Sequence, residues 1–179
     1  MPKTRLDKVL LLAVFSLVSS ACQRNVTLHV QSEIPEALVE KLPLSVGVYY
    51  PAQFRQFAYT ENSETRGTWH IASGDSQVNA FNRIIGDMFT DFRELSAPHE
   101  SAVELVLVPE IAKMQFSTPA ETGFDYFETW VEYVINLKTG DGEPLPEWRY
   151  TGYGQATKER FAGIKIGLAA SLSDALRNA

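Results

Sequence analysis

The chain has 179 residues, with 16 Lys and Arg, 22 Asp and Glu, and a formal net charge of −6 at pH 7. This length supports one domain with a substantial core, but not two. Binding to nucleic acid requires a basic surface, so the acidic balance argues against a nucleic-acid partner. A single cysteine excludes a disulfide within the chain, and the 45% hydrophobic content indicates that packing stabilises the fold.

The first residues have the layout of an export signal. A start with three basic residues and one acidic residue precedes the apolar run 9–18, and small residues then lead to Cys22. The apolar run is too short for a membrane-spanning helix, which needs about 20 residues. We therefore predict that residues 1–21 are a signal peptide that is removed. Its loss leaves 13 basic against 21 acidic residues, a net charge near −8.

The stretch Ser19-Ser20-Ala21-Cys22 resembles the lipobox of bacterial lipoproteins, in which small or apolar residues precede an invariant cysteine. The resemblance implies that Cys22 is acylated and holds the protein on a membrane. Lipoproteins of that family with Asp after the cysteine stay in the inner membrane, so by the same resemblance Gln23 implies the outer membrane of a Gram-negative cell, with the domain facing the periplasm. The alternative is an ordinary secretory signal with an incidental cysteine. We expect an acylated tether over 22–25 and a single domain over 26–179.

The first half of the chain predicts short strands and then a helix. Alternating or apolar runs predict strands over 25–30, 44–50, 54–59 and 68–71. The run Ser73-Gly-Asp-Ser76 is a helix start signal. After it, apolar residues recur with the 3.6-residue period of an amphipathic helix that ends near Pro98; they are Val78, Phe81, Ile84, Ile85, Met88, Phe89, Phe92 and Leu95.

The second half predicts a three-stranded meander and a last helix. The first strand covers 102–108 and continues past Pro109 to Phe116, and the second covers 124–138. A Gly-rich turn at 139–142 leads to the third strand, 147–156. The final stretch, 158–179, is amphipathic and predicts a helix.

This order predicts an α+β fold, a mainly antiparallel sheet of about four to five strands with two amphipathic helices packed on one face. The odd-numbered residues of 127–137 are expected to face the helices. The even-numbered residues then lie on the outer face, which we name as a possible partner-binding surface with Trp130, Val134, Arg149 and Tyr153 at its centre. We expect Val106 and Val108 of the preceding strand to contribute to the same exposed surface. The alternative is a solvated face with ordinary cross-strand pairs. A second binding candidate is aromatic: Tyr49, Tyr50, Phe54, Phe57, Tyr59 and Trp69.

No set of residues in the sequence predicts catalysis, and we expect no metal and no cofactor. The Gly-Asp-Ser block ending at Ser76 resembles one in a class of lipases, but the partner Asp-x-x-His and Gly-x-Asn motifs are absent from the sequence. The three histidines lack metal-ligand spacing. Glu128 and Glu132 share one face of a strand, where a solvated acidic surface is a simpler interpretation than acid–base work.

The lipobox, Gly47-Val-Tyr-Tyr50, the helix from Phe81 to Phe89 and the meander from Trp130 to Gly154 together resemble small outer-membrane lipoproteins of Gram-negative bacteria. These include auxiliary lipoproteins of ABC-type transport systems and lipopolysaccharide-assembly lipoproteins. The resemblance implies a non-enzymatic envelope protein that binds a partner protein or a lipid-transport complex. Two alternatives stay open: a periplasmic regulator of a cell-wall synthesis enzyme, and a hydrolase that uses Ser76.

Overall fold

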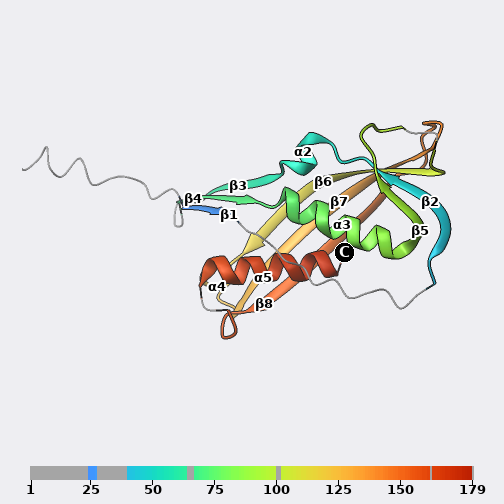
Figure 1. Ribbon diagram of the computed structural model, residues 1–179. Helices are drawn as coiled ribbons and strands as arrows, with labels where there is room; N and C mark the ends of the chain where they lie inside the picture. Colours follow the sequence, from blue (N-terminus) through green and yellow to red (C-terminus); the bar gives the residue numbers. More distant parts are fainter. Residues whose placement is uncertain (1–23, 28–39, 64–66, 100–101, 162, 179) are drawn as a thin grey trace, which may run out of the picture.

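The protein is an α+β molecule built on two sheets, and its computed structural model describes residues 24–27, 40–63, 67–99, 102–161 and 163–178. Helices α3 and α5 lie on one face of the larger sheet, and the smaller sheet extends beyond one end of it (Figure 1). The strands are β1 (Arg24–Thr27), β2 (Leu42–Val48), β3 (Ala58–Ser63), β4 (Gly67–Ala72), β5 (Phe89–Glu94), β6 (Leu105–Ser117), β7 (Tyr126–Thr139) and β8 (Trp148–Thr157). The helices are α2 (Ala52–Arg55), α3 (Gly74–Met88), α4 (Pro119–Thr122) and α5 (Ile164–Arg177).

The larger sheet is mixed, so the expectation of a mainly antiparallel sheet is only partly right. Its order is β5-β2-β6-β7-β8, and β2 runs parallel to both of its neighbours. Only β6, β7 and β8 form the antiparallel meander that the sequence predicts. Parallel pairing needs a crossover connection, and the route from β2 to β5 through β3, β4 and α3 supplies one.

The origin of this error is the end of α3. The apolar period continues past Met88, but the last helical hydrogen bond runs from the Phe89 amide to the Ile85 carbonyl, and residues 89–94 pair with β2 as an edge strand. Leu95 then crosses to the other side of the sheet, where it packs with Val103 and Val106. The helical period therefore extended the predicted helix through the residues that form β5.

The meander agrees with the sequence. Strand β6 passes through Pro109 without a break, and its register shifts between Ile111 and Lys113, so that residue 112 forms a bulge. The turn between β7 and β8 contains Gly142 with a φ of 91°, a conformation that glycine adopts without strain. The three strands therefore form one continuous meander with a single register shift in β6.

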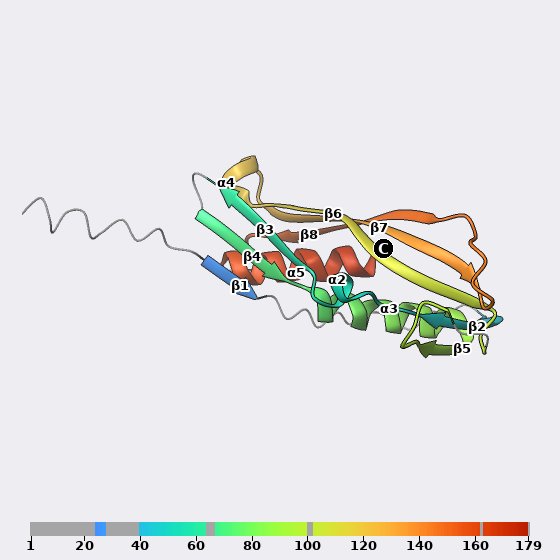
Figure 2. The same ribbon diagram turned by 90° about the horizontal axis from the view of Figure 1, so that it is seen from above.

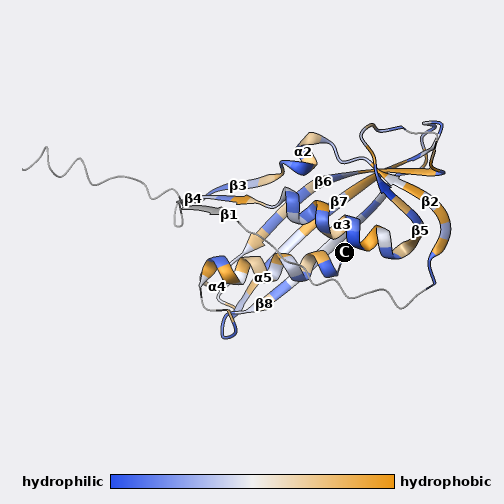
Figure 3. Cartoon of the chain, in the orientation of Figure 1, coloured by the Kyte–Doolittle hydropathy of each residue, from blue (hydrophilic) through white to orange (hydrophobic). Residues whose placement is uncertain are grey.

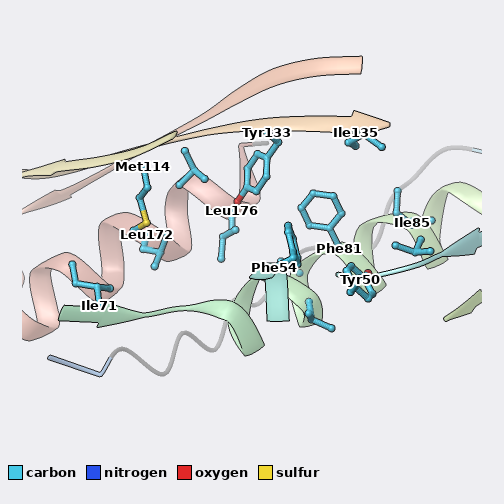
Figure 4. Packing of buried hydrophobic residues seen from close by; sticks show 14 of the residues in the cluster. Tyr50, Phe54, Ile71, Phe81, Ile85, Met114, Tyr133, Ile135, Leu172 and Leu176 are labelled. Carbon is cyan, nitrogen blue, oxygen red and sulfur yellow. The ribbon is translucent and has the colours of Figure 1, made fainter. Parts of the chain in front are cut away.

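The core lies between this meander and the two helices. Phe127, Thr129, Val131, Tyr133 and Ile135 are all at most 4% exposed, which confirms that the odd-numbered residues of β7 face inward. Figure 4 shows the side chains of β7 meeting those of α3 and α5 in this layer. The apolar bands of both helices alternate with polar bands along the chain, as amphipathic helices require (Figure 3).

The aromatic segment that we named as a second binding candidate belongs mostly to the core. Pro51 starts the single turn α2, so residues 52–55 are helical rather than extended. Tyr50, Phe54 and Trp69 are at most 2% exposed. Phe54 stacks on Tyr50 and meets Phe81 edge to face, with ring centroids 5.4 Å apart in both pairs. These rings therefore stabilise the fold and are not available to a partner.

Candidate functional site

The candidate site is the outer face of the meander, on the side of the sheet away from α3 and α5 (Figure 2). Strand pairing places Trp130 between Gln115 of β6 and Tyr153 of β8, and places Glu132 between Lys113 and Thr151. We call this set the outer face; it consists of Lys113, Gln115, Glu128, Trp130, Glu132, Arg149, Thr151 and Tyr153.

Trp130 and Tyr153 form the centre of the outer face. Their rings are tilted by 40°, with centroids 5.1 Å apart. The Tyr153 carbonyl accepts a hydrogen bond from the side chain of Asn178, the residue after α5, so this part of its backbone points away from β7. The two residues therefore form a non-hydrogen-bonded pair, the type in which opposite side chains approach most closely.

A carboxylate fixes the position of this aromatic pair. The Tyr153 hydroxyl donates to Glu128 Oε1 at 2.8 Å, and Ser117 Oγ donates to Glu128 Oε2 at 2.9 Å. Burial, together with the hydrogen bond to Glu128, raises the pKa of Tyr153 to about 12. Tyr153 is nevertheless 37% exposed, so the face presents an aromatic ring whose hydroxyl stays neutral and oriented at physiological pH.

A small hollow opens beside Trp130. It has a volume of 290 Å³ and is lined by an indole ring, one cation, one anion and two neutral polar groups. Those residues are Lys113, Gln115, Trp130, Glu132 and Thr151. Ligand pockets usually measure about 300–1,000 Å³ and are mostly apolar, so this hollow lies at the lower end of that range and is more polar than most.

The charged groups at the hollow are balanced, with Lys113 and Arg149 against Glu132 and Glu147. Arg149 donates to Glu147 at 2.7 Å, and a second guanidinium nitrogen lies 3.6 Å from Glu132. These carboxylates raise the pKa of Arg149, which keeps it charged. Val134 lies opposite Arg149 but is only 6% exposed, so it supports the face and offers little surface of its own.

The outer face is shorter than the sequence suggests. Val106 is fully buried and Val108 is half-buried, because the connection from β5 to β6 covers them with Leu95 and Val103. The expectation that both valines contribute to an exposed surface is therefore wrong. The open part of the face lies over the second half of β6 and its neighbours in β7 and β8.

The described residues of the catalytic alternatives lie in α3, β4 and β7. Ser76 lies in the first turn of α3 and is 7% exposed, and α3 starts after Ser73, as the helix start signal predicts. His70 meets the Thr60 hydroxyl across two strands at 3.1 Å. Glu128 is held by two hydroxyl donors rather than paired with Glu132. Over the described ranges, no cluster of three or more His, Cys, Asp and Glu side chains is arranged to hold a metal ion.

Cys22 and Gln23 lie outside the described residues, as does His29. Strand β1 begins at Arg24 and pairs in parallel with β4, so two residues of the expected tether belong to a strand. In the part of the chain that the structure describes, no helix has both the length and the apolar character needed to cross a bilayer.

Comparison with known proteins supports the fold alone. No family model and no curated protein matches this chain. The crystal structure of protein XCC0632 from Xanthomonas campestris, of the family DUF330, is similar with a TM-score of 0.52 at 8% identity, covering 86% of this chain and 88% of that one. A hypothetical protein, CT253 from Chlamydia trachomatis, matches at a TM-score of 0.41 and 8% identity over 76% of this chain and 92% of its own.

Sequence reasoning identified Trp130, Arg149 and Tyr153 but missed Lys113, Gln115 and Thr151. The β-bulge explains the first two, because it reverses the alternation of β6 between Ile111 and Lys113. The run Ile111-Ala112-Lys113 carries a weak signal of this reversal, since an apolar residue is followed by a small one before the polar alternation resumes.

Proposed function

We propose that this protein is a non-enzymatic, lipid-anchored lipoprotein of the Gram-negative cell envelope that binds a partner protein through the outer face. Cys22 is its acylation site, and the outer membrane, on the periplasmic side, is its location. The partner is an envelope protein or a component of a lipid-transport complex.

The observation that carries the proposal is the pair Trp130 and Tyr153 on an open sheet face beside a hollow of 290 Å³. Aromatic and Arg side chains supply most of the binding free energy in protein interfaces. Glu128 already fixes the Tyr153 hydroxyl, so binding has little side-chain entropy left to remove at this position. Arg149 at the rim adds a charged group of the kind that sets partner orientation.

The anchor has its own support in the sequence. The lipobox-like stretch 19–22 ends in the only cysteine of the sequence, so no second thiol can pair with it. Acyl chains contribute about 0.8 kcal/mol for each buried methylene, so two or three chains on one residue give stable attachment. Mass spectrometry of the mature protein tests this directly. An acylated Cys22 supports the anchor, whereas an unmodified thiol in membrane-bound wild-type protein contradicts it.

The binding test compares two tryptophans. Acylated protein purified from envelopes in mild detergent should carry its partner with it, and Trp130→Ala should lower the recovered partner by about tenfold or more. Trp148→Ala is the matched control, because Trp148 is 48% exposed and lies in register with Ile135 of the inward-facing set. An equal loss in both variants, or no loss in either, argues against the outer face as the binding surface.

A further inference from the structure

One end of the molecule carries two strongly exposed apolar side chains. Phe124 is 65% exposed and Ile166 is 57% exposed, the highest values among the large hydrophobic residues that the structure describes. The Lys158 amide donates to the Asp125 carbonyl at 2.8 Å, which joins the start of β7 to the end of β8. We call this end, with Phe124 and Ile166, the apolar tip.

The start of α5 belongs to the same end. Gly167 lies so close to the ring of Phe127 that an added Cβ would be 2.2 Å from it. Phe127 comes three residues after Phe124, and Gly167 comes directly after Ile166. The contact between Gly167 and Phe127 therefore brings the segments that carry Phe124 and Ile166 together. Figures 1 and 2 both show α4 and the first turn of α5 at one end of the long axis.

The first described strand starts at this end too. Arg24 pairs with Trp69, and the Trp69 ring lies 6.0 Å from the ring of Phe116, centroid to centroid. Phe116 comes just before α4 in the chain. In both ribbon views the start of β1 and α4 are at the same end, while the β7–β8 hairpin is at the opposite end.

Chain length connects the apolar tip to the membrane. Only Gln23 separates Cys22 from Arg24. Each residue spans at most about 3.6 Å, so the two Cα atoms are within about 7 Å of each other in any conformation. An acylated Cys22 must therefore hold the start of β1 at the headgroups of the bilayer, with no tether long enough to lift the domain away from the surface.

From this we infer that the apolar tip rests on the lipid bilayer, with Phe124 and Ile166 in the boundary between headgroups and acyl chains. The inference rests on the proposed acylation of Cys22. Aromatic and aliphatic side chains at a protein end are typical of interfacial membrane contacts. The docking fixes the domain with its β7–β8 hairpin pointing away from the membrane.

The distribution of charge agrees with this orientation. In the described residues of segments 119–125 and 157–166, the exposed ionic side chains are balanced, three of each sign; they are Lys158, Arg160 and Lys165 with Glu121, Asp125 and Glu159. The β7–β8 hairpin at the far end is acidic, with Asp141, Glu143 and Glu147. An anionic surface repels that hairpin and not the apolar tip.

Tryptophan quenching by brominated lipid tests the inference. The parent is the full acylated protein with Trp130→Phe and Trp148→Phe, which keeps only Trp69, 1% exposed. Phe124→Trp or Ile166→Trp is added, and each protein is placed in vesicles of phosphatidylethanolamine and phosphatidylglycerol, with or without bromine in the upper acyl chain. Leu145→Trp is the matched control, because Leu145 is 41% exposed in the far hairpin.

We expect bromine to remove at least about half of the fluorescence added at positions 124 and 166, since these rings lie at acyl-chain depth, and to leave that at position 145 unchanged. Absence of quenching at 124 and 166, with acyl mass on Cys22, overturns the docking while the anchor stands. Quenching at 145 alone assigns the opposite orientation and also overturns it. If the protein carries no acyl mass on Cys22, both the proposed anchor and the proposed docking are wrong.

Discussion

The two faces of strand β7 differ in what covers them, although their residues alternate along one segment of chain. On the inner face, Tyr133 is fully buried, stacks on Tyr150 and donates a hydrogen bond to Gln77 of α3. On the outer face, Trp130 is half-buried and its neighbours are polar. The inner face is covered by helices and stabilises the fold, whereas the outer face stays open and is the surface that we propose for binding a partner.

The largest expected difference comes from removing one ring from each face. Tyr133→Ala should lower the free energy of unfolding by about 3–5 kcal/mol, because it leaves a cavity between β7 and α3. Trp130→Ala should cost about 1 kcal/mol or less, since this ring is half-buried on the outer face and not enclosed in the core. Urea unfolding measures both changes. Equal losses in the two variants would show that the outer face is also structural.

Two glycines give the next contrast. Gly154 on the inner side of β8 touches the backbone of α5, so that an added Cβ would lie 2.0 Å from the Ser171 carbonyl oxygen. Gly154→Ala should therefore displace α5 and cost about 1–3 kcal/mol or more. In Gly86→Ala the nearest atom is a Phe92 ring carbon at 3.6 Å, an ordinary contact, so better helix propensity should stabilise α3 by about 1 kcal/mol.

Thermal unfolding checks this pair of variants. We expect a raised melting temperature for Gly86→Ala and a lowered one for Gly154→Ala. A neutral Gly154→Ala would mean that α5 shifts away from β8 at little cost, which the packing described above contradicts.

Removal of a single hydroxyl from each face should give a smaller difference in stability between the faces. Tyr133→Phe leaves the buried Gln77 carbonyl oxygen without this donor, which costs about 1–3 kcal/mol. Tyr153→Phe removes a hydrogen bond to Glu128 at the surface, where water replaces it, so the cost should be below about 1 kcal/mol. Partner recovery should respond in the opposite order, with the larger loss in Tyr153→Phe. The reverse order would contradict the division between the two faces.

The ionisation of buried tyrosines at alkaline pH is the last of these effects, and it changes the free energy of unfolding least at neutral pH. Burial raises the pKa of Tyr50, Tyr133 and Tyr150 well above the usual value of about 10. The native state then holds protons that the unfolded chain releases, so the contribution of these tyrosines to stability is constant below about pH 10 and falls as the pH rises beyond it. Tyrosinate absorbance should therefore appear together with loss of native circular dichroism. Ionisation of all three rings in a folded protein would contradict their burial.

The sequence predicted the antiparallel half of this fold well and the parallel half poorly. Alternation over 124–138 identified which residues of β7 face the helices, because an antiparallel strand with one wet face keeps period 2. The failures came from Phe89, Phe92 and Leu95, which fit a helical period and yet belong to a strand and the loop after it. Local pattern does not reveal where a helix stops when the next apolar residues keep the same spacing.

The candidate site shows the same limit. Trp130 and Tyr153 could be named from alternation and from the hairpin turn between their strands. Lys113 and Gln115 depend on a bulge, which changes the register without changing composition. The cover over Val106 depends on a long-range connection that no local pattern encodes.

A photoreactive side chain placed in the outer face tests the central claim most directly. The full chain carries it at Lys113, beside the hollow, or at Trp148 as the control in the inward-facing register, and it is expressed in Gram-negative cells. We expect one defined adduct from position 113, none from position 148, and loss of the adduct when Trp130→Ala is added. Adducts of equal yield at both positions, or an adduct unchanged by Trp130→Ala, would contradict recognition through the outer face.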